Sequence, residues 1–425
     1  MTIDIGRPVI DLGLERINAL LQLVGSPHQQ LEDRKIPIVH VTGTNGKGST
    51  VEMIASGLRE DSVVGVFTSP YLLIEQDSIR VFRNNKPTNI SSDDWKKIQN
   101  HIFSIVREND QSLAPPTDFE VLFTTALIHF ASQLDLTHLV IEVGMGGRLD
   151  ATNVFQKTTV CVVTSIGLDH QKFLGDTREK ICVEKCGIFK RNCHVIVNGE
   201  IDDPCLEIIA DKFAMSGGKS MTVVDPDDTH NLVPPLNGSH QNQLFGIAIE
   251  VIQVLQKTAE IETIQDRIRQ YTKLPGRLER RNDDSKFPSL VLDGAHNEQS
   301  AIALRQFIDI EKVLEKKKSI VWIIGVSEGR SETILPHLLQ SDDICVCVNF
   351  CPEDGKKSTW VKCTSSTELA KEAVKYCYNV YSIDGLVEEG IAFATSRYDA
   401  NSHLFVVAGS LYLVRNYLQC CETNS

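Results

Sequence analysis

Short apolar runs alternate with longer amphipathic stretches along most of the chain. Before about residue 285, the runs with the length and β-branched content of buried strands are 36–41, 62–67, 137–143, 158–164 and 194–197. The stretches between them have helical spacing; in residues 49–58, for example, Val51, Ile54 and Leu58 recur on one side. This alternation predicts a parallel sheet covered by helices.

A second series follows the polar stretch 279–286. Its predicted strands, each followed by a helical stretch, are 289–293, 319–324, 344–349 and 404–408. We therefore expect an α/β protein with an N-terminal domain over 1–280, whose sheet is mainly parallel, a linker at 281–288, and a smaller Rossmann-like domain over 289–425. Ligands of such sheets bind beyond the carboxyl ends of the strands, so a site shared between the domains is expected.

The charge and hydropathy of the chain exclude several classes of protein. A formal net charge of -13 over 425 residues argues against a nucleic-acid surface, which needs clustered Lys and Arg. No apolar run reaches the about 18 residues that span a bilayer. The acidic start, residues 1–5, lacks the basic region of a signal peptide. We expect a cytoplasmic protein that binds neither nucleic acid nor membrane.

The twelve cysteines are scattered and include no C-x-x-C pair. Several, such as Cys345 and Cys347, lie in apolar strand-like runs, which favours reduced and mostly buried thiols. Cys182 and Cys186 are four residues apart on a predicted helix, but no partner pair has zinc spacing. We therefore do not expect a metal–thiolate site.

A glycine-spaced loop, residues 42–50 with the sequence T-G-T-N-G-K-G-S-T, follows the first strand. Glycines let successive backbone N–H groups point at an anion, and the next helix presents its positive end. Lys47 adds a charge, and Ser49 or Thr50 offers a hydroxyl to a nucleotide-bound magnesium ion. Lys47 precedes the last glycine, unlike the lysine of the common G-x-x-x-x-G-K-[ST] loop. This loop predicts that the N-terminal domain, 1–280, is a P-loop-type ATPase domain, and the alternative is a plain turn between strand and helix.

Two further strand ends carry groups suited to a metal. Ser69, in the turn T-S-P at 68–70, is placed to reach a metal or phosphate, although alone the segment is only a turn. Glu142 ends an apolar strand, where an unpaired carboxylate is costly, so it requires a cation. Magnesium held by carboxylates and nucleotide phosphates is the usual solution in ATP enzymes, and a structural salt bridge is the alternative.

The loop after Glu142, G-M-G-G-R-L-D-A-T-N at 144–153, permits close backbone approach, and Asp150 is a candidate to bind a polar heterocycle. His170, in L-D-H at 168–170, is a candidate metal ligand oriented by Asp169, or else a hydrogen-bonded loop residue. Lys185 lies in the segment E-K-C-G-I, and its spacing does not reveal a role.

The second series of strands has one such constellation. Asp293 and His296 lie in D-G-A-H-N at a predicted strand-to-helix turn, where side chains are well placed for substrate or ribose contacts. Arg277, in P-G-R just before the linker, is suited to phosphate charge.

Together these motifs resemble the folate branch of the Mur-ligase superfamily, whose members are dihydrofolate synthases and folylpolyglutamate synthases. The matching segments occur in order over nearly the whole chain and are G-T-N-G-K-G-S, T-S-P, E-V-G-x-G-G-R-L-D-A-T-N, L-D-H, E-K-x-G-I, P-G-R, D-G-A-H-N and G-S-L-Y-L at 409–413. The resemblance implies an ATP-dependent amide ligase that phosphorylates a carboxylate and lets the amino group of L-glutamate displace phosphate.

The resemblance also implies roles residue by residue. The ATP-binding residues would be Gly43, Thr44, Asn45, Gly46, Lys47, Gly48, Ser49, Arg277 and Asp293. Two magnesium ions would be held by Ser69, Glu142, His170 and a carbamylated Lys185, and pterin by Asp150 and Ala151. Lys47, Lys185 and His296 would act in catalysis, with His296 near the incoming glutamate. These roles agree with the electrostatics of phosphoryl transfer, because lysine, arginine and magnesium stabilise the charge on the transferring group.

Within this family the tetrad R-L-D-A at 148–151 resembles the dihydrofolate synthase type of bacteria and fungi, and Asn45 stands where folylpolyglutamate synthases usually carry lysine. We therefore expect dihydropteroate, L-glutamate and ATP as substrates of a monomeric enzyme, with tetrahydrofolate glutamylation as the alternative. Tyr71 and Leu244 depart from the family pattern, at a usual histidine and a usual asparagine. The Leu244 departure bears on adenine recognition.

Two other classes of protein fit the sequence less well. A catalytically silent nucleotide-binding scaffold should have lost one of the chemical residues, yet Lys47, Glu142, His170, Lys185 and Asp293 are all present. A Mur ligase acting on a cell-wall nucleotide needs a further domain before the glycine loop, and only 42 residues precede Gly43.

Overall fold

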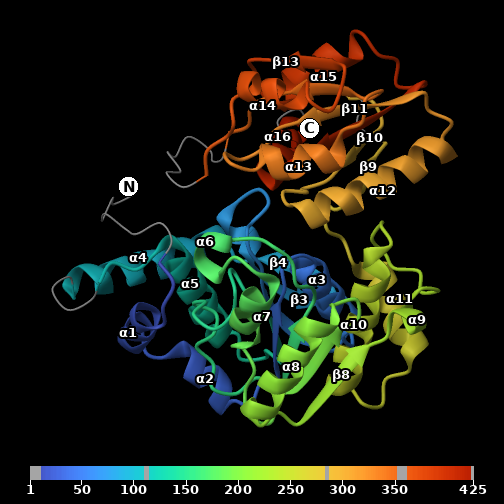
Figure 1. The fold of residues 1–425 in the computed structure, drawn as a ribbon. Coiled ribbons are helices and arrows are strands. Elements are labelled where there is room, and N and C mark those ends of the chain that lie inside the picture. The colour runs from blue at the N-terminus through green and yellow to red at the C-terminus, as the bar shows by residue number, and fades with distance from the viewer. Residues whose placement is uncertain (1–10, 110–113, 283–286, 352–360, 423–425) are drawn as a thin grey trace. The chain divides into compact units, whose positions relative to one another are not determined.

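The computed structural model describes residues 11–109, 114–282, 287–351 and 361–422 and is drawn in Figure 1. The chain divides into two units. The first comprises Met1–Pro235 and Gln241–Lys273, and the second comprises Leu236–His240 and Leu274–Ser425. The predicted linker at 281–288 stays a prediction.

The first unit is built on an eight-stranded sheet with the order β4-β3-β2-β5-β1-β6-β7-β8. All neighbouring strands are parallel except for the antiparallel pairs β2–β3 and β3–β4. The strands are β1 (Ile38–Thr42), β2 (Val63–Phe67), β3 (Ile79–Arg83), β4 (Lys86–Asn89), β5 (His138–Glu142), β6 (Val160–Val163), β7 (His194–Asn198) and β8 (Ser220–Val224).

Helices surround this sheet (Figure 1). They are α1 (Glu15–Leu23), α2 (Pro27–Asp33), α3 (Lys47–Gly57), the 3₁₀ helix η1 (Glu75–Ser78), α4 (Ser92–Glu108), α5 (Asp118–Ser132), α6 (Gln171–Leu174), α7 (Arg178–Cys186), α8 (Asp203–Ser216), α9 (Pro226–Thr229), α10 (His240–Leu255) and α11 (Ile261–Tyr271). The first residue of α10, His240, belongs to the second unit.

The core of the first unit follows from the apolar runs. The strands β1, β5 and β6 are buried along their whole length except at His138, as expected of central parallel strands covered on both faces. Side chains of α5 pack with those of β1 and β5, and side chains of α7 and α8 pack with those of β6 and β7. Because β1 lies between β5 and β6, the loop that follows it lies beside the ends of both neighbouring strands.

The second unit contains a six-stranded sheet with the order β13-β12-β11-β14-β10-β9, parallel except for the β9–β10 pair. Its strands are β9 (Glu279–Arg281), β10 (Leu290–Leu292), β11 (Ser319–Ile324), β12 (Ile344–Cys347), β13 (Asn379–Ser382) and β14 (His403–Ala408). Its helices are α12 (Glu298–Leu314), α13 (Ser331–Leu338), α14 (Ser366–Ala373), α15 (Val387–Thr395) and α16 (Leu411–Glu422). Trp322 lies at its centre and is fully buried.

The predicted α/β architecture with two mainly parallel sheets is confirmed, and every strand predicted from an apolar run is present. The sequence missed β3, β4, β8, β9 and β13. The outer strand β4 of the first sheet is exposed along its whole length, and the edge strands β8 and β13 are only partly covered, with Val224 as their one buried residue. An edge strand buries little, so its sequence carries only a weak hydrophobic signal.

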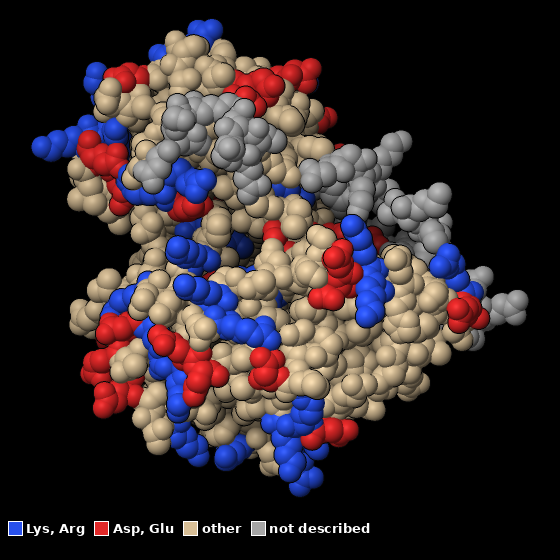
Figure 2. Space-filling model, turned by 180° about the vertical axis from the view of Figure 1, so that it is seen from behind, with Lys and Arg blue, Asp and Glu red and all other residues tan. Residues whose placement is uncertain are grey.

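All twelve cysteines are free thiols, as predicted. Among the described residues, no helix is long and apolar enough to cross a membrane. Basic and acidic side chains are interspersed over the face of the molecule shown in Figure 2.

Candidate functional site

The glycine loop lies at the carboxyl edge of the first sheet. Strand β1 ends at Thr42 and helix α3 begins at Lys47, so the loop spans 43–46. A Cβ on Gly43 would lie 1.8 Å from Thr164 Oγ1, which leaves no room for a side chain. Gly46 has φ +83°, a conformation that favours glycine. Both glycines are therefore required by the path of the backbone.

The end of β6 fixes this loop through hydrogen bonds. Thr44 N donates to Ser165 O at 2.9 Å and Asn45 N to Ser165 Oγ at 2.8 Å. Thr164 Oγ1 donates to Asn45 O at 2.6 Å. These bonds hold the loop against β6. The first amides of α3, which helix geometry leaves without intrahelical acceptors, are candidates to form an anion cradle.

Two lysines converge on one carbonyl of the loop. Lys47 Nζ donates to Gly43 O at 3.1 Å and to Thr44 O at 3.3 Å, and Lys185 Nζ donates to Gly43 O at 2.8 Å. Lys185, on α7, is buried, and burial followed by repulsion from Lys47 lowers its pKa to about 7. A substantial share of Lys185 is therefore a neutral amine near pH 7, which makes it chemically reactive.

Glu142 and Ser69 come together, as the sequence predicted for metal ligands. Glu142 ends β5 in a buried position, and its Oε2 accepts a hydrogen bond from Ser69 N at 3.1 Å. A Cβ on Gly48 would lie 3.5 Å from Glu142 Oε2, so the absent side chain leaves space between this carboxylate and the start of α3. A buried carboxylate facing such a space fits a divalent cation.

His170 is exposed and precedes α6 as its N-cap residue, in a left-handed conformation with φ +51°. The buried carboxylate of Asp169 accepts a hydrogen bond from His170 N at 2.8 Å. No three His, Cys, Asp or Glu side chains cluster as a metal site within the described ranges. The predicted ligand set contains only one carboxylate and one imidazole, so it needs the carbamate on Lys185 or nucleotide phosphates to be complete.

Asp150, predicted to bind pterin, is buried in its own loop. Its carboxylate accepts hydrogen bonds from Met145 N at 2.8 Å and from the Thr152 N–H at 3.0 Å and hydroxyl. Because Thr152 Oγ1 donates to Asp150, it accepts from Nε2 of the buried His40, 2.8 Å away on β1. Ala151 belongs to the adjoining core. The pterin role of Asp150 and Ala151 stays a prediction.

The same loop also clamps the helix that carries Lys185. A Cβ on Gly147 would lie 2.7 Å from Lys185 O, so the two backbones are in close contact. Arg148 N donates to Glu184 O, and the Arg148 guanidinium pairs with the Glu184 carboxylate at 2.9 Å. The loop and α7 are thus joined on either side of Lys185.

Leu244, where the family pattern has asparagine, packs against the glycine loop. It is buried, and its Cδ1 lies 2.8 Å from the position of a Cβ on Gly46. The Leu244 side chain therefore makes an apolar contact with the glycine loop at the position where the family pattern has a polar asparagine.

In the second unit the structure brings Asp293, Arg277 and His296 together. Asp293 follows β10, is buried, and accepts hydrogen bonds from Leu278 N and Ala295 N, each at 2.8 Å. Burial raises its pKa to about 6 against the lowering effect of Arg277. Arg277 Nη1 lies 3.2 Å from the Cβ position of Gly294, the residue next to Asp293.

His296 Nδ1 lies 2.9 Å from Gly294 O. A carbonyl only accepts, so this nitrogen carries the proton. His240, which sequence reasoning did not single out as a site residue, also lies near Arg277. Burial and then Arg277 lower the pKa of His240 to about 4, so it is neutral near pH 7.

The residues that the sequence did not identify are mainly those that position the site residues, not the site residues themselves. His40, inside the apolar run 36–41, is a polar exception whose partner could not be identified without the fold. The pairing of Arg148 with Glu184 likewise joins segments 36 residues apart in the chain.

Two family models match this chain. The Mur ligase middle domain matches residues 41–265, and the domain described as "Dihydrofolate synthetase, C-terminal domain" matches residues 277–420. The Schizosaccharomyces pombe protein named "Probable dihydrofolate synthetase" is 31% identical, with 95% of this chain and 97% of the relative covered. The dihydrofolate synthetase of Saccharomyces cerevisiae is 29% identical, with 96% and 98% covered.

Solved structures agree with these matches over nearly the whole chain. Folylpolyglutamate synthase of Mycobacterium tuberculosis complexed with ADP has a TM-score of 0.82 at 26% identity, covering 98% of this chain and 96% of that chain. Escherichia coli FolC in complex with DHPP and ADP has a TM-score of 0.76 at 26% identity, covering 99% and 96%. A bifunctional folylpolyglutamate synthase/dihydrofolate synthase with Mn, AMPPNP and L-glutamate bound has a TM-score of 0.75 at 25% identity, covering 97% and 95%.

Proposed function

Because this chain belongs to the folylpolyglutamate synthase and dihydrofolate synthetase family of Mur ligases, we propose that it is a dihydrofolate synthetase. It joins L-glutamate to 7,8-dihydropteroate at the expense of ATP and releases dihydrofolate, ADP and phosphate. The observation that carries this proposal is the full-length match to two fungal dihydrofolate synthetases, together with a match of the C-terminal residues 277–420 to the domain of that name.

Nucleotide phosphates bind at the glycine loop and the start of α3. The proposed ATP ligands in the first unit are Gly43, Thr44, Asn45, Gly46, Lys47, Gly48 and Ser49. In support, the backbone turns where glycines are required, and the Lys47 ammonium is held at the loop by Gly43 O and Thr44 O. An anionic phosphate offers Lys47 a stronger partner than these carbonyls, so the side chain turns toward the nucleotide on binding.

Magnesium would be held by Glu142, Ser69 and His170, and a second ion would be held by a carbamate on Lys185. The buried Glu142 carboxylate and the space beside Gly48 support the first assignment. The lowered pKa of Lys185 supports the second, because only a neutral amine adds to carbon dioxide. When bound, magnesium neutralises the developing charge of the phosphoryl group.

The ligation has two steps. A carboxylate oxygen of dihydropteroate attacks the γ-phosphorus of ATP, so that ADP leaves and an acyl phosphate forms. The neutral amine of glutamate then attacks the acyl carbon, loses a proton, and expels inorganic phosphate. Lys47 stabilises charge in the first step, Arg277 and Asp293 contact ATP, and His296 lies near the glutamate amine. Asp150 and Ala151 bind the pterin, and a monomer in the cytoplasm is the expected form.

The acyl phosphate can be tested by isotope transfer. Dihydropteroate labelled with ¹⁸O in its carboxylate is incubated with the protein, ATP, magnesium and L-glutamate. The proposed route predicts one ¹⁸O atom in each inorganic phosphate released, measured by mass spectrometry. Phosphate without label in the presence of amide product would contradict the acyl phosphate.

A further inference from the structure

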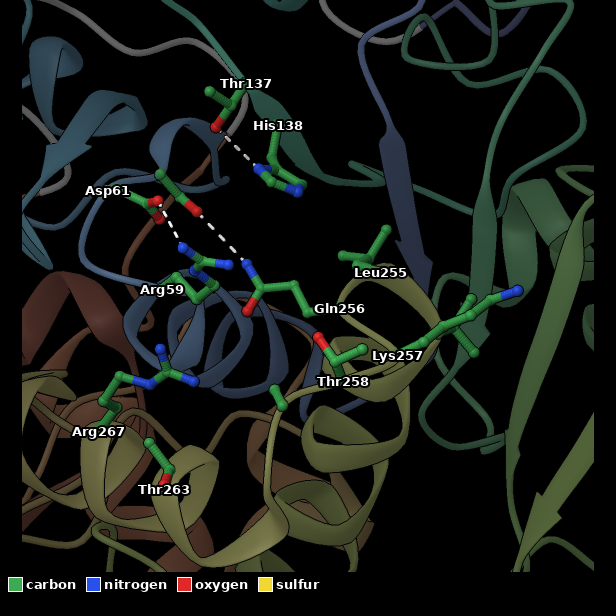
Figure 3. Close-up of a pocket in the computed structure, with 13 residues that line it drawn as sticks. Arg59, Asp61, Thr137, His138, Leu255, Gln256, Lys257, Thr258, Thr263 and Arg267 are labelled. Carbon is green, nitrogen blue, oxygen red and sulfur yellow. Dashed lines mark hydrogen bonds and ion pairs between the residues drawn. The ribbon is translucent and has the colours of Figure 1, made fainter.

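A pocket of about 730 Å³ lies in the first unit at the edge of the sheet where β2 and β5 begin (Figure 3). The glycine loop follows the carboxyl end of β1, so it lies at the opposite edge of this parallel sheet. The walls come from the α3–β2 connection, the start of β5, and the segment 254–267. None of its lining residues belongs to the candidate site described above.

The lining contains more basic groups than acidic ones. Arg59, Lys257 and Arg267 line the pocket with one carboxylate, Asp61, to which Arg59 is paired at 2.8 Å. Figure 3 shows the guanidinium groups of Arg59 and Arg267 on the same side of the pocket, while the Lys257 side chain extends away from them.

The carboxylates near Arg267 do not compensate for its burial. Glu60 and Asp61 raise the pKa of this guanidinium, but burial is the larger effect, and Arg59 adds repulsion, so the pKa is lowered. Glu60 already accepts a hydrogen bond from Tyr271 Oη at 3.2 Å. A partly buried cation that neighbouring acids leave undercompensated favours an additional anion.

His138 adds no charge to this balance. Its Nδ1 lies 2.8 Å from Thr137 Oγ1, and burial lowers its pKa to about 4, so the ring is neutral near pH 7. The positive charge of the pocket therefore comes from the arginines and Lys257.

Two polar atoms of the lining lack a partner. Nε of Arg267, a donor, and Oε1 of Gln256, an acceptor, are buried and make no hydrogen bond among the described residues. The other end of the Gln256 amide is used, since Nε2 donates to Ser62 Oγ at 3.4 Å. Buried polar groups in native proteins are nearly always satisfied, so each of these atoms calls for a partner.

We propose that this pocket binds a small oxyanion that also carries an O–H group, with its anionic oxygens on Arg267 and Arg59 and its hydroxyl donating to Gln256. A guanidinium is a planar fork of donors that matches carboxylate and phosphate oxygens. Hydrogen phosphate and 2-hydroxy carboxylates both provide the anionic oxygens and the O–H donor. Sulfate provides only the oxygens, and succinate lacks the hydroxyl.

Direct binding to the full chain tests this site. Isothermal titration with inorganic phosphate, malate, sulfate or succinate is carried out on the wild type, Arg267→Gln, Arg269→Gln and Lys47→Ala. Arg269 lies on the same helix but binds Val233 O and Asp266 outside the pocket, so it is the matched charge control. Lys47→Ala removes a phosphate contact at the glycine loop and leaves this pocket intact.

We expect phosphate or malate to bind the wild type, Arg269→Gln and Lys47→Ala with similar affinity, and Arg267→Gln at least about tenfold more weakly, as for one lost charge-assisted hydrogen bond. Sulfate and succinate should bind more weakly than their hydroxylated counterparts. Binding lost only in Lys47→Ala would place the anion at the glycine loop, and undiminished binding to Arg267→Gln would also overturn the proposal. If Arg267→Gln does not fold, the exposed Arg59→Gln provides the same comparison.

Discussion

Lys185 should reduce the stability of the fold that contains it, and replacing it with methionine tests this. Burial and the nearby Lys47 lower the pKa of Lys185 from 10.5 to about 7. This change corresponds to about 5 kcal/mol of unfavourable free energy for holding the charge in the folded state below pH 7. Methionine keeps an unbranched apolar side chain that is one atom shorter and uncharged, but it loses the hydrogen bond to Gly43 O. That loss costs about 1–2 kcal/mol.

We therefore expect Lys185→Met to exceed the wild type in free energy of unfolding by about 2–4 kcal/mol at pH 6, while losing turnover. In the wild type the folded state releases the Lys185 proton above pH 7, whereas the unfolded lysine keeps it to about pH 10.5. Wild-type stability thus rises with pH in this interval, and the advantage of the variant should shrink by about 2 kcal/mol between pH 7 and pH 9.

Urea denaturation of both proteins from pH 6 to pH 9 measures this difference, in buffer free of carbon dioxide so that no carbamate replaces the ammonium. Lys180→Met is the control, because Lys180 lies on the same helix, exposed and paired with Asp176. Its stability should stay within about 0.5 kcal/mol of the wild type. If Lys185→Met were destabilised by the same amount at every pH, the account of Lys185 as a strained, mostly neutral amine would be refuted.

Three other substitutions test separate parts of the account. Glu142→Gln should keep the fold and lose at least about 100-fold in turnover, because it removes the charge proposed to hold magnesium; near-normal steady-state rates would exclude that role. Gly43→Ala places a Cβ 1.8 Å from Thr164 Oγ1, so ATP binding measured by titration should be lost, and unchanged affinity would show that the loop takes another path. Asp293→Asn turns an N–H₂ group toward one of two backbone donors, so a free energy of unfolding lower by about 1–3 kcal/mol is expected in urea; an unchanged value would contradict the hydrogen bonds assigned to Asp293.

The sequence predicted those elements of the fold whose burial produces an apolar pattern in the sequence. Strand β1 is buried along its length and mostly apolar because helices cover both faces of the sheet, and β11 is mostly buried and apolar for the same reason. The hairpin of β3 and β4 escaped prediction, because the second strand is fully exposed and polar. The family predicted from the ordered motifs is confirmed by the comparisons.

The candidate site was predictable where one segment carries its own chemistry, as in the loop that contains Lys47. It was not predictable where partners come from distant segments. The contact of Lys185 with Gly43 O joins residues 142 positions apart, and only the fold shows that Lys185 is buried next to Lys47, which together lower its pKa. The Asp150 carboxylate is the opposite case, a residue whose chemistry can be read from one segment but whose contacts differ from the prediction. Its chemistry suggested a ligand contact, whereas in the structure amides of its own loop donate to it.

The identity of the acceptor is the central claim, and ADP release tests it most directly. Purified protein with magnesium, ATP and L-glutamate is given either 7,8-dihydropteroate or tetrahydrofolate. The account predicts glutamate-dependent ADP release with dihydropteroate and little with tetrahydrofolate. Turnover with tetrahydrofolate alone would make the chain a folylpolyglutamate synthase, and silence with both acceptors despite ATP binding would leave a nucleotide-binding scaffold; either result would contradict the account.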